Sequence, residues 1–375
     1  MIYLDHAASS PLVPEALKML SEANECFFAN PSAKHSLGHN LANKIEEVRK
    51  IILEHFGADL KFDLIFTSGA TESNNIFIQS CTDCSTAYFF SGDHPSLYLP
   101  VIHTFKEHHK ISLKNILSEG PSDNQKSLHA VSLVNGQSGE CLNLDELKKL
   151  KSQFPQAVVF LDCSQAFTKV FELQGFLRRH FQLIDGLSLS AHKMGGPKGI
   201  GALIFKKNFK LQSIYLGGGQ EKGIRPGTLS APLILSWGEA IKKREKDLLN
   251  VGAMKVRYLK LIEMLKLSFG DKIIFPFENK LNSFFILSFI LPSIPADILI
   301  RHLEEKGIYL STSSACSSKI EGKNPVFAAM GIDDLYHKNI LRVSLSYETT
   351  LAELQIFTEE LRTVYFNLLE LFGKK

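Results

Sequence analysis

The alternation of short apolar runs with helical patterns between about residues 40 and 240 constrains the fold of this chain most strongly. Such alternation is typical of parallel strands joined by crossover helices. The helical pattern is clearest where Leu41, Ile45, Val48, Ile52 and Phe56 recur at steps of three and four residues, so that one face packs on a sheet. The predicted strands cover residues 64–67, 87–91, 130–134, 158–162, 186–190 and 201–205. We therefore expect an α/β fold with a mostly parallel sheet flanked by helices.

The pattern changes after about residue 250. A long helix is followed by an apolar strand over 283–291 and by a helix that starts at Pro295, whose fixed φ suits a first helical turn. The last helix opens with Thr350 and Glu353 at the spacing of a capping box. At 375 residues the chain is long enough for two domains. We predict a large domain over 13–250 and a smaller α+β domain over 1–12 and 251–375.

Composition excludes several classes of function. Lys and Arg number 42 against 39 Asp and Glu, and a net charge of +3 is too small to favour nucleic acid. The longest apolar stretch, 284–291, is too short for a bilayer, and the N-terminus lacks a secretory signal. Cys81 and Cys84 have the spacing of a zinc pair, but no second pair follows, so no metal site is expected. We expect a cytoplasmic protein whose six cysteines are thiols, with no nucleic acid or membrane partner.

Lys193 follows a predicted buried strand and precedes a glycine-rich turn, Gly195-Gly196-Pro197-Lys198-Gly199. A lysine at a rigid strand end is partly desolvated, which lowers the pKa of its ammonium group and frees the amine for Schiff-base chemistry. The alternative is a surface lysine in a hairpin turn. These residues alone leave both interpretations open.

The segment Thr67-Ser68-Gly69-Ala70-Thr71-Glu72 lies between a predicted strand and a predicted helix. Small residues there let backbone N–H groups at the helix N-terminus approach a phosphate, and Thr71 adds a hydroxyl donor. A plain helix N-cap would use the same residue types. No Walker lysine follows, which disfavours a nucleoside triphosphate.

Two further polar residues follow predicted strands. Asp162 ends an apolar strand, where a carboxylate needs a partner, either a protonated pyridine nitrogen or the N-terminus of the next helix. His94 lies beyond the strand that ends at Ser91, where its ring could stack on an aromatic cofactor and relay protons. A lone loop histidine more often does neither.

The C-terminal third contains two candidates. Cys316 lies in a run of small polar residues ahead of Lys319 and Lys323, which predicts a mobile loop and favours a thiolate nucleophile. An incidental cysteine in a serine-rich turn is the alternative. Arg342 is flanked by apolar residues and needs a carboxylate partner, from the protein or from a substrate.

Together and in this order, these segments resemble the cysteine desulfurases, pyridoxal-phosphate enzymes of the class V aminotransferase group. The resemblance covers nearly the whole chain. Its motifs are Tyr3-Leu4-Asp5-His6-Ala7-Ala8, Asn30-Pro31-Ser32, residues 67–74, 162–165, His192-Lys193, residues 217–228, Ser314-Ala315-Cys316-Ser317 and Arg342-Val343-Ser344-Leu345.

The resemblance implies conversion of L-cysteine to L-alanine, with a persulfide left on Cys316 for an acceptor protein. Lys193 would hold pyridoxal phosphate and act as a base, His94 would stack on the cofactor, and Arg342 would bind the substrate carboxylate. Thr228 resembles a residue that reaches the phosphate of the neighbouring subunit, which implies a homodimer. The implied cofactor-binding residues are Ala70, Thr71, His94, Asn135, Asp162, Gln165, Ser190, His192, Lys193 and Thr228.

One departure from the family pattern concerns Gly136, which stands where the family has an asparagine that faces the cofactor. Asn135 could take its place, or Gln165 could hold the ring alone. Two other functions remain open: a related lyase or aminotransferase of the same group that acts on another amino acid, such as selenocysteine, or a weakly active member that serves as a binding scaffold. Cys316 favours the desulfurase, because an aminotransferase has no use for a loop thiol.

Overall fold

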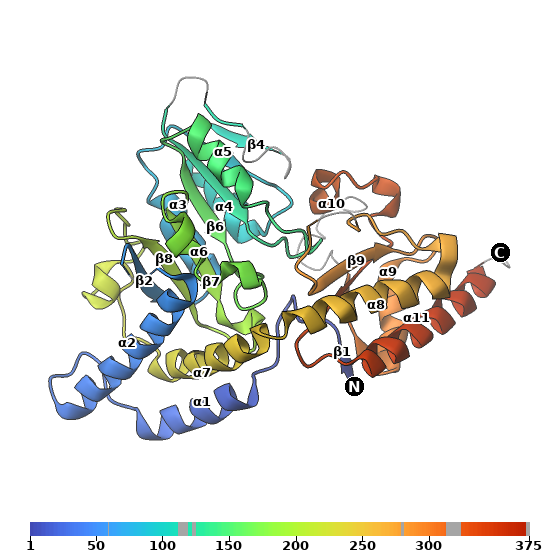
Figure 1. The fold of residues 1–375 in the computed structure, drawn as a ribbon, viewed down its shortest axis with the longest axis horizontal. Coiled ribbons are helices and arrows are strands. Elements are labelled where there is room, and N and C mark those ends of the chain that lie inside the picture. Colours follow the sequence, from blue (N-terminus) through green and yellow to red (C-terminus); the bar gives the residue numbers. More distant parts are fainter. Residues whose placement is uncertain (59, 112–118, 122–124, 279–280, 313–323, 373–375) are drawn as a thin grey trace. The chain divides into compact units, whose positions relative to one another are not determined.

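The computed structural model describes residues 1–58, 60–111, 119–121, 125–278, 281–312 and 324–372. The chain divides into two compact units (Figure 1). The smaller unit comprises Met1–Ser9, Asn135–Cys141 and Leu249–Lys375, and the larger comprises Ser10–Val134 and Leu142–Leu248.

The larger unit is built on a seven-stranded sheet. Its strand order is β2 (Phe62–Thr67), β8 (Gly201–Lys206), β7 (Gly186–Ser190), β6 (Val158–Asp162), β5 (Ser127–Ser132), β3 (Thr86–Phe89) and β4 (His108–Lys110). Strand β8 is antiparallel to both of its neighbours, and the other pairs are parallel. The predicted mostly parallel sheet is confirmed. Strand β4 was not predicted, because its side chains are exposed and polar and its pairing with β3 alone makes it a strand.

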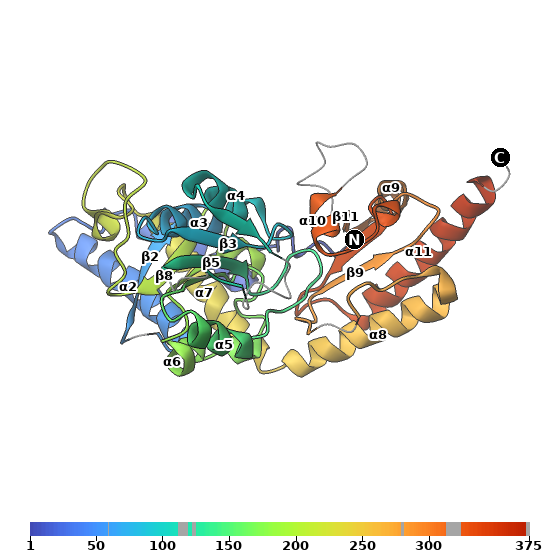
Figure 2. The same ribbon diagram turned by 90° about the horizontal axis from the view of Figure 1, so that it is seen from above.

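Helices cover both faces of this sheet (Figure 2). One face carries α3 (Ala70–Gln79) and α4 (Pro95–Thr104), where the ring of Phe77 stacks on that of Phe160 of β6 with centroids 4.3 Å apart. On the other face Trp237 of α7 (Ala231–Leu248) meets Phe66 of β2 edge to face. The remaining helices of the unit are α1 (Pro14–Cys26), α2 (Ser36–Phe56), α5 (Asp145–Gln153) and α6 (Phe176–His180), with the 3₁₀ turns η1 (Phe171–Leu173), η2 (Ala191–Lys193) and η3 (Gln220–Gly223).

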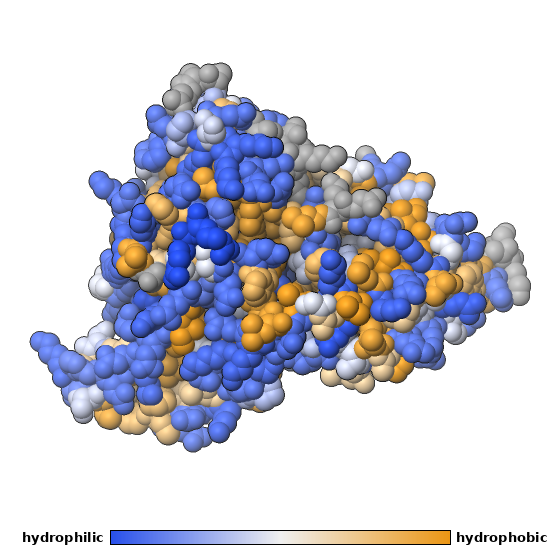
Figure 3. Space-filling model, viewed as in Figure 1, coloured by the Kyte–Doolittle hydropathy of each residue, from blue (hydrophilic) through white to orange (hydrophobic). Residues whose placement is uncertain are grey.

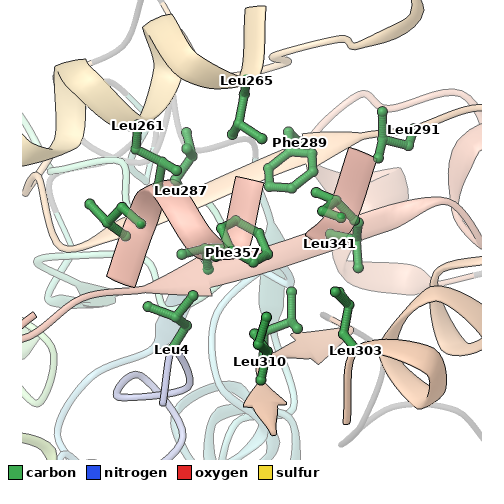
Figure 4. Close-up of a cluster of buried hydrophobic side chains, with 14 of the residues drawn as sticks. Leu4, Leu261, Leu265, Leu287, Phe289, Leu291, Leu303, Leu310, Leu341 and Phe357 are labelled. Atoms are coloured by element: carbon green, nitrogen blue, oxygen red, sulfur yellow. The ribbon is translucent and has the colours of Figure 1, made fainter. Parts of the chain in front are cut away.

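The smaller unit is α+β. Strands β11 (Ser311–Thr312), β12 (Ile340–Ser344) and β9 (Ile286–Ile290) form an antiparallel sheet, and β1 (Ile2–Tyr3) pairs in parallel with β10 (Ile308–Tyr309). Its helices are α8 (Val251–Phe269), α9 (Ala296–Glu305), α10 (Pro325–Ala329) and α11 (Leu351–Phe372), with the 3₁₀ turns η4 (Gly270–Lys272) and η5 (Asp334–Tyr336). In its core Leu261 and Leu265 of α8 point toward Leu287 and Phe289 of β9 (Figure 4). The expected strand and the helix beginning near Pro295 are both present.

Hydrophilic residues dominate the face of the protein seen in Figure 3, with smaller hydrophobic patches between them. Among the described residues, no helix is both long and apolar enough to cross a bilayer.

Candidate active site

The carboxyl ends of β2, β7, β6, β5 and β3 lie at one edge of the large sheet, because these strands all run in the same direction. In open α/β sheets this edge is where ligands bind. The residues that follow these strands include Gly69, His94, Asp162 and Lys193. The sheet therefore gathers most of the residues that the sequence marked as candidates.

The turn between β2 and α3 leaves a helix N-terminus open. Gly69, the N-cap, has φ 157° and ψ 179°, a conformation that is essentially restricted to glycine, and as a glycine it has no side chain with which to cap the helix. A Cβ atom at Gly69 would meet nothing within 4 Å. The first N–H groups of α3, beginning with those of Ala70 and Thr71, have no acceptor within the helix, which suits an anion such as a phosphate.

An acidic residue braces this turn. The Oε2 atom of Glu72 accepts a hydrogen bond from the backbone N–H of Ser68 at 2.5 Å, and Oε1 accepts one from Nε of Arg225 at 3.0 Å. Glu72 is buried. The ion pair thus joins the phosphate-type turn to the segment that carries Thr228, a residue that is itself exposed.

Lys193 is the last residue of the turn η2, which follows β7 directly. The backbone of this turn is held by the N-terminal segment, because Ser10 donates its N–H to the carbonyl of His192 at 2.8 Å and its hydroxyl to that of Lys193 at 3.3 Å. Burial lowers the pKa of His192 to about 4, and Lys193 and Lys198 act in the same direction. His192 is therefore neutral at pH 7, so the turn does not carry a second cation there.

A second lysine, Lys169, lies nearby and was not found from the sequence. Its Nζ donates to Oε1 of Gln165 at 3.4 Å. Burial, together with the charges of Lys193 and Arg244, lowers the pKa of Lys169 to about 7. The two lysines lie close enough for the charge of Lys193 to lower the pKa of Lys169, and an anionic ligand between them would favour the protonated form of both.

Asp162 closes β6 with its carboxylate held on both oxygens. Oδ1 accepts from the N–H of Ser164 at 2.9 Å and Oδ2 from the amide of Asn74 at 3.2 Å. The residue is 6% exposed, and in the part of the chain that the structure describes it forms no ion pair. A buried carboxylate without a cation is unfavourable, so a positively charged partner would stabilise it.

His94 is the N-cap of α4, and its Nδ1 accepts from the backbone N–H of Ser96 at 3.2 Å. Partial burial lowers the pKa of His94, Asp162 raises it and Lys193 lowers it. His94 is exposed to solvent, yet Asp162 and Lys193 lie close enough to affect its pKa.

Arg342 and Asn135 belong to the smaller unit. Arg342 on β12 donates from Nη1 to the carbonyl of Gly136 at 3.0 Å and from Nη2 to Oδ1 of Asp5 at 2.9 Å, and its buried Nε has no partner among the described residues. Oδ1 of Asn135 accepts from the backbone N–H groups of Gln137 and Ser138 at 2.9 and 3.1 Å. Cys316 lies outside the described residues.

Sequence reasoning missed Asn74, Ser96, Glu72, Arg225 and Lys169. The signal for Asn74 is its place three residues after Thr71 on the same helix, which puts both on neighbouring positions of one face. Arg225 and Glu72 lie 153 residues apart, and no local pattern links them.

The family model described as aminotransferase class-V matches residues 2–357. The chain belongs to this family. The chain is 32% identical over 384 residues to a cysteine desulfurase IscS of Rickettsia peacockii, covering 94% of this chain and 88% of the relative. It is 29% identical over 389 residues to a NifS/IcsS protein homolog of Lactobacillus delbrueckii, covering 97% of each. The family resemblance inferred from the motifs is confirmed.

Solved structures agree with this assignment. The chain superposes on a NifS-like protein from Rickettsia africae with a TM-score of 0.83 and 25% identity, covering 97% of this chain and 99% of that one. A cysteine desulfurase from Thermococcus onnurineus has a TM-score of 0.81 at 19% identity, with 98% of this chain and 95% of that one covered, and shows the shared fold alone. The expected fold class is confirmed.

Proposed function

We propose that this chain is a pyridoxal-phosphate-dependent cysteine desulfurase. The observation that carries the proposal is Asp162, a buried carboxylate without an ion pair at the sheet edge that also holds Lys193 and the open N-terminus of α3. Relatives named cysteine desulfurase, 29% and 32% identical over 97% and 94% of this chain, support it.

The residues present fit this cofactor. Its phosphate matches the uncapped first turn of α3 with Ala70 and Thr71, and the buried Asp162 supplies the acceptor that a protonated pyridine nitrogen needs. The other proposed cofactor-binding residues of the larger unit are Ser190, His192 and Gln165. The ring of His94 would stack on the cofactor. When bound, pyridoxal phosphate supplies an electron sink that stabilises negative charge next to the amino carbon of the substrate.

The chain's own groups would then divide the work. Lys193 would hold the cofactor covalently and take the proton from the substrate carbon. Arg342, with two donor groups already oriented by Asp5 and Gly136, would bind the substrate carboxylate. Sγ of Cys316 would bond to the sulfur of L-cysteine as the carbon–sulfur bond breaks, and the carbon, once protonated, would leave as L-alanine.

We further propose a homodimer in which Thr228 reaches the phosphate of the second subunit, and a sulfur-acceptor protein that collects the persulfide. The exposure of Thr228 and the anchoring of its segment through Arg225 and Glu72 support the first part. Gel filtration with light scattering measures dimer formation. If Thr228 holds the phosphate, Thr228→Ala should lose the cofactor more readily than the parent.

The experiment is turnover of L-cysteine by the purified protein loaded with pyridoxal phosphate. Sulfide and alanine should form in equal amounts under reducing conditions. Cys316→Ser should keep the visible cofactor band and lose sulfide release by about a hundredfold or more, the scale on which removal of a catalytic group acts. Lys193→Ala should lose the covalent adduct that borohydride traps.

Cys26→Ser is the matched control, since Cys26 is an exposed thiol at the end of α1, which carries none of the proposed site residues, and its loss should leave turnover unchanged. Sulfide release by Cys316→Ser at the parent rate would remove Cys316 from the mechanism. Amino transfer from another amino acid without sulfide would identify the protein as an aminotransferase, and cofactor binding with no turnover would identify a scaffold.

A further inference from the structure

A chain of hydrogen bonds joins His94 to Asp162 through two residues that the proposed function does not use. Asn74, fully buried on α3, donates from Nδ2 to Oδ2 of Asp162 at 3.2 Å and to Oγ of Ser96 at 3.1 Å. Oγ of Ser96 in turn lies 2.8 Å from Nδ1 of His94. The bonds bridge three separate elements, α3, β6 and α4.

The direction of each bond in this chain follows from the charge of Asp162. An ionised carboxylate can only accept, so the amide nitrogen of Asn74, and not its oxygen, must face Asp162. This orientation leaves Oδ1 of Asn74 buried without a partner among the described residues, an unfavourable state that the two bonds made by Nδ2 offset.

The second amide hydrogen of Asn74 is donated to Oγ of Ser96, which therefore acts as the acceptor in this hydrogen bond. The hydroxyl hydrogen of Ser96 is then directed to Nδ1 of His94, and the backbone N–H of Ser96 donates to the same atom at 3.2 Å. With two donors aimed at Nδ1, a neutral imidazole carries its proton on Nε2.

We propose that Asn74 is a positioning residue that holds the carboxylate of Asp162 and, through Ser96, fixes His94 as the tautomer protonated on Nε2. In this state the ring presents a hydrogen-bond donor, while its basic atom Nδ1 is covered. His94 thus stacks and donates from Nε2, and Lys193 is left as the base. This inference rests on the proposed function, because it assigns Asp162 and His94 to the cofactor.

The charged groups that act on His94 are consistent with this arrangement. Lys193 disfavours a positive imidazole and Asp162 favours it, while partial burial disfavours it, and the net effect is a lowered pKa. A proton on Nδ1 would also face the hydroxyl and backbone N–H donors of Ser96 and would break the hydrogen bonds that they donate.

The test is two-bond ¹H–¹⁵N spectroscopy of the purified protein with ¹⁵N-labelled histidine, first without cofactor and then titrated with pyridoxal phosphate. The His94 signals are assigned by their absence from His94→Gln. In the parent, His94 should be protonated on Nε2. In Asn74→Ala and Ser96→Ala the form protonated on Nδ1 should become detectable, and in Ser96→Ala the titration midpoint of His94 should move upward toward 6.5.

Measurements of cofactor affinity distinguish the hydrogen bond from Asn74 to Asp162 from the one to Ser96. Asn74→Ala should raise the dissociation constant of pyridoxal phosphate about tenfold, because it loses a hydrogen bond to a charged group. Ser96→Ala should change it less than about threefold, since the bond from Asn74 to Asp162 remains. Asn75→Ala is the matched control on the same helix, where the Asn75 amide donates to the carbonyl of Thr71 at 2.8 Å.

A parent His94 protonated on Nδ1, or an unchanged tautomer in both variants, overturns the inference. If Asn74→Ala does not fold, the Ser96→Ala spectrum decides. A parent protein that binds no pyridoxal phosphate contradicts the proposed function instead, and the tautomer of His94 in the cofactor-free protein still tests the hydrogen-bond chain.

Discussion

A lysine that is 6% exposed has lost most of its hydration, and the pKa of Lys169, lowered to about 7 from an ordinary value of 10.5, is the result. Between these values the unfolded chain binds a proton at this position that the folded chain does not. The contribution of Lys169 therefore makes the free energy of unfolding rise with pH across this window, by at most about 1.4 kcal/mol per pH unit. The loss of stability caused by burying the Lys169 ammonium is complete below pH 7 and absent above pH 10.5.

Lys169→Met should remove this dependence, because methionine fills a similar volume without a charge. We expect the cofactor-free variant to be more stable than the parent at pH 7 by about 1–4 kcal/mol, and the difference to shrink by pH 10. Urea unfolding at pH 7, 8.5 and 10 measures it. Lys210→Met, at an exposed lysine, is the control and should follow the parent. A pH-independent difference between parent and Lys169→Met would contradict the assignment.

Gly136 tests the departure from the family pattern. Its φ is not in the left-handed region, so the backbone does not require glycine there. If an asparagine at this position faces the cofactor, as the resemblance implies, Gly136→Asn should add one hydrogen bond of roughly 0.5 to 1.5 kcal/mol and slow loss of pyridoxal phosphate on dialysis by about two- to tenfold.

Gly136→Ala separates backbone from side-chain effects, since it adds a Cβ atom without a donor. Equal cofactor loss from the parent, the Asn variant and the Ala variant would mean that Gln165 or Asn135 already fills the role. Oδ1 of Asn135 is engaged in its own turn, so a contribution from that residue would have to come from its amide nitrogen.

At the scale of elements, the start of α11 was foreseen from the spacing of Thr350 and Glu353. The structure contains the full capping box: the N–H of Thr350 donates to Oε2 of Glu353 at 2.8 Å, and the N–H of Glu353 donates to Oγ1 of Thr350 at 3.2 Å. These bonds satisfy two backbone donors that the first turn would otherwise leave to water.

Thr350→Ala should lower the free energy of unfolding by about 1 kcal/mol. Thr363→Ala provides a control on the same helix, because the Thr363 hydroxyl bonds to the carbonyl of Glu359 inside the helix and caps nothing. That substitution should change stability by less than about 0.5 kcal/mol. Chemical denaturation measures both, and equal losses would show that capping is not the cause.

At the scale of the whole molecule, each unit has a hydrophobic core of its own. Phe289 is fully buried on β9 in the core of the smaller unit, whereas the proposed cofactor-binding residues around Lys193 belong to the larger one. Units with separate cores can unfold separately when one of them is weakened.

Phe289→Ala should cost about 3–5 kcal/mol in the smaller unit. On heating we expect loss of helical circular dichroism in two steps, with the visible cofactor band surviving the first. Leu267→Ala, at a side chain of α8 that is 81% exposed, should melt like the parent. A single transition in which both signals disappear together would show that the two units unfold as one.

The sequence by itself determined the central strands and the family. Strands β6 and β7 begin and end at the residues expected, because strands buried on both faces need continuous apolar runs that can be read locally. Gly69, Asp162 and Lys193 were found for a related reason: each ends such a run or follows it within three residues, and parallel strands end at a common edge.

The tertiary structure alone decided the contacts that hold these residues in place. Asn74 meets Asp162 and Ser96 across 88 and 22 positions of sequence, and Glu72 meets Arg225 across 153. The low pKa of Lys169 likewise depends on burial and on neighbours distant in the chain. A hydrogen bond or a desolvation energy is set by distance in space, and local periodicity carries no record of which distant side chain the fold will bring within 3 Å.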